Sequence, residues 1–185
     1  MPIAFHDDES VHRLGFAAYL HLKIADSAAC AAVLFLNARG EPQEFVYNRL
    51  ELLSPELWRG PDRVTGAARR LCASLFSSAT LTPQFLLYSP ENFPPEVFRD
   101  QGGVRLEIPV GAVTVQPNGE DSVGLSTIGV NGEIFQARIE WLPRAPAGEL
   151  LPLLAKRGLL LEPFGRLAAG LCEVYPELFL DLEDD

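Results

Sequence analysis

Apolar and polar side chains alternate over residues 16–24, and this period of two predicts a half-buried β-strand. Phe16, Ala18, Leu20, Leu22 and Ile24 form the apolar face. The opposite face carries Tyr19, His21 and Lys23. We therefore expect the chain to enter a sheet early, with one face of this strand against the core.

Two further strands are expected directly afterwards. Residues 30–36 are apolar throughout, which is typical of a central strand covered on both faces. Residues 37–40 read Asn-Ala-Arg-Gly and supply a turn, and the pattern over 44–52 predicts a third strand. We expect the second and third strands to pair as a hairpin.

A helix is expected to start at Gly60-Pro61-Asp62. Proline is tolerated in the first turn because the backbone N–H that it lacks has no partner within the helix there. The helix dipole stabilises an acidic side chain such as Asp62 at this end. The apolar residues from Ala67 to Phe76 keep the spacing of one helical face. After Pro83 the chain resets for a short apolar strand at 85–88.

The second half is predicted to be rich in strands before it ends in helices. Alternation over 104–110 predicts a strand, and Asn131-Gly132 predicts a hairpin turn between strands at 123–128 and 134–141. Two helices are expected after the sheet, at 148–155 and 163–174.

This order of elements predicts an α+β fold with a mixed or mostly antiparallel sheet and helices packed on one side. We expect a flexible N-terminal arm at 1–15, a single domain at 16–175 with a subdivision, if any, near 102–103, and an acidic C-terminal tail at 176–185. At 185 residues the chain has the size of one domain, or at most two small ones.

The strand, strand, strand, helix, strand order of residues 16–89 resembles the first half of a ribonuclease-H-like sheet. Longin-like and profilin-like interaction domains have related patterns. Enzymes of the ribonuclease-H-like fold carry one acid in the first strand and another at the end of the fourth to hold divalent metals. Residues 16–24 and 85–88 contain no acid, so the resemblance implies a form without metal chemistry.

The negative net charge of the chain limits the kinds of molecule that it is expected to bind. The chain holds 25 acidic and 15 basic residues and has a formal net charge of −10, which disfavours binding to nucleic-acid phosphates and anionic membranes. A local patch of Arg59, Arg63, Arg69 and Arg70 is the candidate exception for nucleic acid. A solvated helix face is the simpler interpretation of that patch.

The sequence gives little evidence for metal-binding or catalytic residues. The cluster at 6–12 contains two histidines and three acids, but it lies near the terminus without an apolar period to hold it, so we interpret it as a solvated arm. Glu41 and Glu44 could act as an acid and base pair if they faced each other; a solvated hairpin tip is the simpler interpretation. We therefore expect no metal, no cofactor and no catalytic residue.

Scattered cysteines at 30, 72 and 172, without Cys-x-x-Cys spacing, are interpreted as small buried hydrophobes. Their odd number and the acidic N-terminus, which does not resemble a signal peptide, predict a cytoplasmic protein. The longest uncharged stretch contains Pro83 among many hydroxyl side chains, so no membrane segment is expected.

Aromatic residues near proline-rich loops offer candidate anchors for a protein partner: Trp58, Phe93 and Phe98. The alternative is that these rings fold back over the core as a lid. Together, these observations lead to a first hypothesis of a non-enzymatic cytoplasmic protein-interaction module, an accessory protein or subunit of a larger assembly. The alternative is an enzyme or nucleic-acid-processing subunit whose metal-dependent acidic site assembles only in the fold.

Overall fold

The computed structural model describes residues 14–52, 59–99, 104, 106–116, 125–128 and 134–179. Its centre is a seven-stranded mixed sheet with the order β3-β2-β1-β4-β5-β7-β6. The strands are β1 Ala17–Ile24, β2 Ala28–Leu36, β3 Pro42–Glu51, β4 Phe85–Tyr88, β5 Val110–Gln116, β6 Leu125–Ile128 and β7 Ile134–Leu142. The α+β class with a mixed sheet is confirmed.

The first half of the chain has the predicted order of strands and helix, although β1, predicted to be half-buried, is buried on both faces. Strands β1 and β2 pair antiparallel, β3 pairs antiparallel with β2 as a hairpin, and β1 and β4 are parallel neighbours. A crossover helix, α2 (Gly60–Ser78), connects β3 to β4. This is the strand, strand, strand, helix, strand order on which the resemblance to a ribonuclease-H-like sheet rests.

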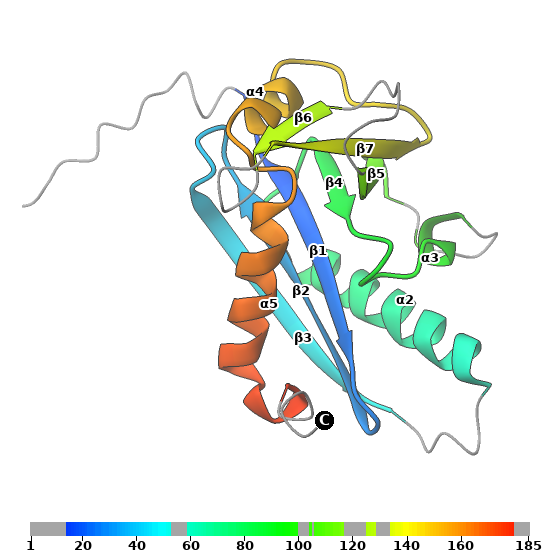
Figure 1. Ribbon diagram of the computed structural model, residues 1–185. Helices are drawn as coiled ribbons and strands as arrows, with labels where there is room; N and C mark the ends of the chain where they lie inside the picture. The colour runs from blue at the N-terminus through cyan, green and yellow to red at the C-terminus, as the bar shows by residue number, and fades with distance from the viewer. Residues whose placement is uncertain are drawn as a thin grey trace, which may run out of the picture.

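Helices cover both faces of the sheet, and the expectation that they pack on one side needs correction (Figure 1). Helix α2 closes one core with Leu20, Val33 and Leu86, while α4 (Leu150–Lys156) and α5 (Glu162–Val174) close a second core on the opposite face. The physical reason is that β1, β2 and β4 are buried on both sides, so each face needs a cover.

The strand expected at 104–110 is placed differently. Strand β5 begins only at Val110 and continues to Gln116, where it pairs parallel with β4 and antiparallel with β7. The apolar side chains of Val104, Leu106 and Ile108 instead pack against the core on the α2 face, and the Val104 N–H donates to the Val97 carbonyl. Alternation there reflects side-chain packing of a loop beside the short helix α3 (Glu96–Arg99).

The remaining predicted elements have mixed outcomes. The antiparallel pairing of β6 with β7 confirms the predicted hairpin, although its turn at 131–132 lies outside the described residues. Three other predicted features also lie outside the described residues: the N-terminal arm up to residue 13, the possible subdivision of the domain near 102–103, and residues 180–185 of the acidic tail. The start of that tail forms a 3-10 turn, η2 (Pro176–Leu178), and Leu178 is buried.

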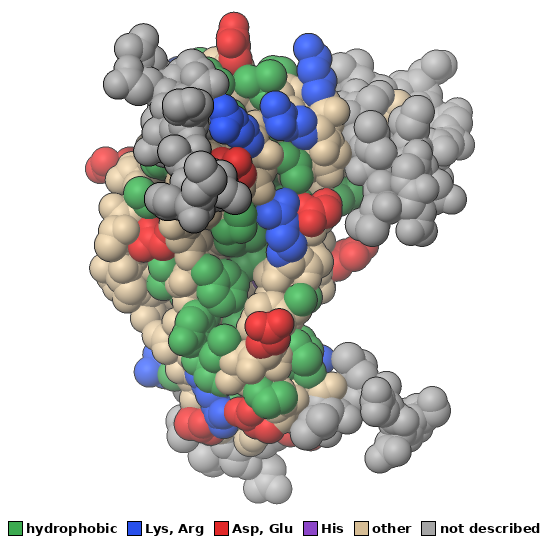
Figure 2. All heavy atoms as spheres, turned by 90° about the vertical axis from the view of Figure 1, so that its left-hand side faces the viewer, with side chains coloured by type: hydrophobic (Ala, Val, Ile, Leu, Met, Phe, Trp, Pro, Cys, Tyr) green, Lys and Arg blue, Asp and Glu red, His purple; other side chains and the backbone are tan. Residues whose placement is uncertain are grey.

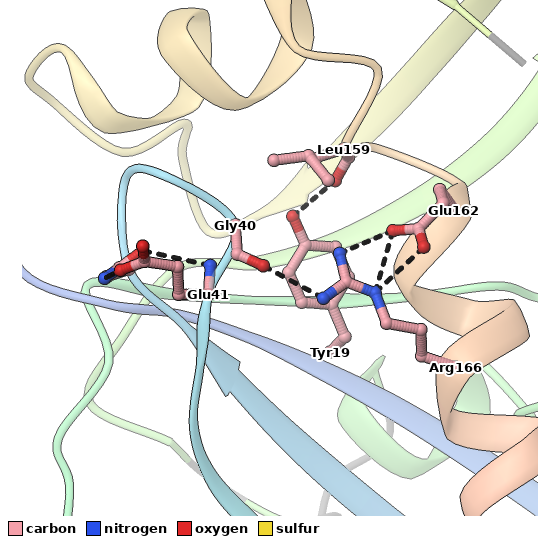
Figure 3. Close-up of polar contacts among 7 residues, drawn as sticks. Tyr19, Gly40, Glu41, Leu159, Glu162 and Arg166 are labelled. Carbon is pink, nitrogen blue, oxygen red and sulfur yellow. Dashed lines mark hydrogen bonds and ion pairs between the residues drawn. The ribbon is translucent and has the colours of Figure 1, made fainter. Parts of the chain in front are cut away.

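A polar cluster ties the first turns of α5 and the chain before them to β1 and the β2–β3 turn (Figure 3). The buried Tyr19 hydroxyl donates to the Leu159 carbonyl at 2.6 Å. The Arg166 guanidinium pairs with Glu162 one turn away and donates to the Gly40 carbonyl at 2.9 Å. These bonds fix the α4–α5 connection against β1 and the β2–β3 turn. No helix in the described part of the chain is long and apolar enough to span a bilayer.

Candidate nucleic-acid interface

The central strands offer little acid–base or metal chemistry. Among the described residues, no group of three or more His, Cys, Asp or Glu side chains is placed to hold a metal ion. The titratable side chains of β1 on the α5 face include His21, which is 8% exposed. Burial, followed by the nearby Lys23 charge, lowers the pKa of His21, so this imidazole is neutral at pH 7.

The two glutamates considered as an acid and base pair are engaged separately. The Glu41 carboxylate accepts a hydrogen bond from the Asn37 side-chain amide at 2.7 Å. The Glu44 carboxylate instead accepts the backbone N–H groups of Thr80 and Leu81, both at 2.9 Å. Each glutamate therefore stabilises a local connection, and the structure does not bring them together as a catalytic pair.

The candidate partner anchors have different positions. Phe93 is 1% exposed and stacks on Phe98, with ring centroids 5.5 Å apart. Both rings also contact the buried Tyr88 ring. The structure therefore matches the alternative in which these two rings fold back over the core. Trp58 lies outside the described residues.

Hydrophobic side chains gather in the middle of the face over β3 and α5, with charged side chains around them (Figure 2). Tyr47 is 47% exposed and packs against the Tyr175 ring. The neighbouring Arg49 forms ion pairs with Glu51 and Glu177. Because Arg49 already has two carboxylate partners, it offers little net attraction for an anionic ligand.

Helix α2 presents a different electrostatic surface. Its residues 60–78 contain three arginines and one acid, Asp62, and Arg59 occupies the N-cap position. The local balance is therefore positive on a chain whose formal net charge is −10. Arg59 and Arg70 are exposed, and Arg63 and Arg69 are partly buried. A ligand at this helix meets the local charge rather than the average of the chain.

Helical geometry gathers three of these arginines on one side of α2. Arg59, Arg63 and Arg70 are separated by four and seven residues, which returns the side chains to nearly the same face of a helix. At 1.5 Å of rise per residue, the row is about 16 Å long. The Arg63 Nη2 group donates to the Asp26 carbonyl of the β1–β2 connection, which fixes one member of the row.

Two hollows flank α2. One is lined by Leu50, Glu51 and Leu52 at the end of β3, and by Arg63, Gly66, Ala67 and Arg70 of the helix, and has a volume of about 90 Å³. The other is wider, about 770 Å³, and is lined by the first turns of α2 together with Arg69, Pro94 and Glu96. Arginine side chains thus border concave surfaces on both sides of the helix.

Comparisons with known proteins add little to this geometry. No family model and no curated protein matches the chain. Among solved structures, the chain is similar to the endonuclease V of Bacillus subtilis, at 11% sequence identity and a TM-score of 0.42. The similarity covers 69% of this chain and 65% of that chain, which is less than two thirds of its length.

The first hypothesis from sequence, a non-enzymatic protein-interaction module, is corrected at this point. Phe93 and Phe98, two of the three anchors on which that hypothesis rested, pack against each other at the core, and the solved structure named above is an endonuclease and not an interaction module. At this TM-score the similarity assigns neither a site residue nor an activity to the chain.

Proposed function

We propose that the chain is a nucleic-acid-processing subunit that binds a phosphate backbone through helix α2. The observation that carries this proposal is the row of Arg59, Arg63 and Arg70 on one face of α2, with Arg69 beside it. Arginine suits the role because its planar guanidinium donates paired hydrogen bonds to phosphate oxygens and keeps its charge at all physiological pH values.

Local geometry further supports this assignment. Among the described residues, no carboxylate pairs with Arg59 or Arg70, the exposed ends of the row, whereas Arg49 on the opposite face is paired twice. Asp62, on the same helix, is offset from the row by about a quarter of a turn. The negative net charge of the chain repels a polyanion from the rest of the surface, so α2 is the preferred point of contact.

The processing chemistry itself is not assigned to the described residues, because they contain no metal-binding group of three or more ligands. The proposed role is therefore to hold a strand, as a subunit that works beside a catalytic partner. A reducing compartment such as the cytoplasm fits the free thiols. Cys30 and Cys72 lie buried in the two cores, whereas Cys172 is exposed, so its interpretation as a buried hydrophobe is wrong.

A pair of charge-matched double variants tests this role. Arg59→Gln with Arg70→Gln removes both exposed ends of the row, while Arg144→Gln with Arg157→Gln removes two exposed arginines elsewhere and gives the same net charge. We expect the first variant to bind a fluorescein-labelled oligonucleotide about tenfold more weakly at low salt, because it loses two phosphate contacts. The second variant should bind within about twofold of wild type.

Fluorescence anisotropy measures both affinities, and thermal melting confirms that both variants fold. Equal losses in the two double variants would show that only net charge matters, and would contradict a specific role for α2. Absence of oligonucleotide binding by the wild-type protein at about 50 mM salt would contradict the proposal altogether.

A further inference from the structure

We infer that the smaller hollow, between the end of β3 and α2, receives one unpaired nucleobase. Helix α2 would then bind single-stranded nucleic acid in preference to a duplex. This inference rests on the proposed function and names its substrate class. It depends on the walls of the hollow, its size and the position of the two arginines at its rim.

The walls of the hollow are mainly apolar. Leu50 of β3 and Leu52, directly after the strand, pack on the α2 face, and Ala67 is a buried residue of α2. Glu51, the acidic residue of the lining, has its carboxylate 2.8 Å from the Arg49 guanidinium on the α5 side of the sheet. An apolar surface of this kind suits the flat face of a base and does not suit a phosphate.

The rim carries the complementary charge. Arg63 and Arg70 lie on either side of Gly66, three residues before it and four residues after it. Their guanidinium groups can pair with the phosphates on both sides of an inserted base, and guanidinium planes also stack on bases. The hollow therefore combines a site for a base with cations for the backbone that carries it.

The size of the hollow selects a single ring system. Its volume of about 90 Å³ is well below the roughly 300–1,000 Å³ of pockets that enclose whole ligands. The sugar and phosphates must therefore remain outside, on the arginine row. In a duplex each base is paired and stacked, so it reaches such a hollow only after the energetically costly step of leaving the stack.

Gly66 provides a test that changes no charge. A Cβ added at Gly66 meets no atom of the described residues within 4 Å, so a larger side chain enters open space. Gly66 lines both hollows beside α2, so Gly66→Leu places a larger side chain at their shared edge and narrows the smaller one. Leucine also favours the helix more than glycine does. Gly165→Leu on α5 is the matched control, because a Cβ at that exposed helical glycine is equally free of described neighbours.

The experiment compares one labelled 16-nucleotide DNA strand, alone and annealed to its complement, by fluorescence anisotropy at about 50 mM salt. We expect the wild-type protein and Gly165→Leu to bind the single strand about tenfold more tightly than the duplex. Gly66→Leu should lose this preference and keep its duplex affinity, because the arginine row remains. Gly66→Ala, with one methyl group in the hollow, should lose part of the preference.

The outcomes separate this inference from the proposed function. If Gly66→Leu and Gly66→Ala melt like the wild type and keep its full preference for the single strand, the base site is overturned. Binding of the backbone by α2 is not affected by that result. Equal weakening of single-strand and duplex binding would also overturn it. Failure of the wild-type protein to bind either form would overturn the inference together with the proposed function.

Discussion

At the level of single residues, Tyr19 shows how a polar atom is satisfied inside the core. The side chain is fully buried, and its hydroxyl donates to the Leu159 carbonyl across 140 positions of sequence. Burial raises the pKa of Tyr19 far above its ordinary value, so the hydroxyl remains a donor at every accessible pH. The alternating pattern placed Tyr19 on the more polar face of β1, but its partner arises from the fold and could not be predicted.

Tyr19→Phe should destabilise the protein by about 1–2 kcal/mol, because it removes one buried hydrogen bond and leaves a carbonyl without its donor. Urea unfolding followed by circular dichroism measures the change. Tyr47→Phe is the control, since Tyr47 is 47% exposed and its hydroxyl can be replaced by water contacts. Equal stabilities for Tyr19→Phe and Tyr47→Phe would contradict a stabilising role for the Tyr19 bond.

Secondary-structure elements were predictable where a local period determined them. Helix α2 starts at the predicted Gly60-Pro61 because proline, helical spacing and a buried face agree within one segment. The strand expected at 104–110 failed because the same alternation also occurs in a loop that packs every second side chain against the core. Periodicity reports which side chains are buried, and the hydrogen-bonding partner of the backbone depends on distant segments.

Glu44 stabilises the connection between α2 and β4. Burial alone would raise the pKa of this carboxyl, but the N–H groups of Thr80 and Leu81 and the Thr80 hydroxyl bond the charged form and lower the pKa overall. A lowered folded-state pKa means that the stabilisation is present above the pKa of the unfolded chain and is lost as the pH falls through the folded value.

Glu44→Gln should therefore be less stable than wild type at pH 7, by less than about 1 kcal/mol because the site is solvated. The difference should shrink as the pH falls from 7 to about 2, because the wild-type carboxyl also becomes protonated once the pH passes through its lowered pKa. Melting temperatures at the two pH values measure this, with the exposed Glu173→Gln as control. A difference between Glu44→Gln and wild type that is the same at both pH values would exclude the charged acceptor as its cause.

At the scale of the whole molecule, the average and the local charge point in opposite directions. The formal charge of −10 disfavours a nucleic-acid partner, and for that reason the arginines of α2 were interpreted from the sequence as a solvated face. The fold changes this picture by pairing Arg49 with acids on the α5 face and leaving a row of arginines beside a hollow on α2. The hollow lies between the end of β3 and α2, so no pattern within one segment of the sequence could have predicted it.

The salt dependence of binding tests the central claim, backbone contact by α2, most directly. Each phosphate contact to a single strand contributes about 0.7 to the slope of log affinity against log salt concentration. Loss of the two contacts in Arg59→Gln with Arg70→Gln should therefore reduce the wild-type slope by about 1.4, while Arg144→Gln with Arg157→Gln should leave it unchanged. Identical slopes for wild type and both double variants would contradict the assignment of phosphate contacts to α2.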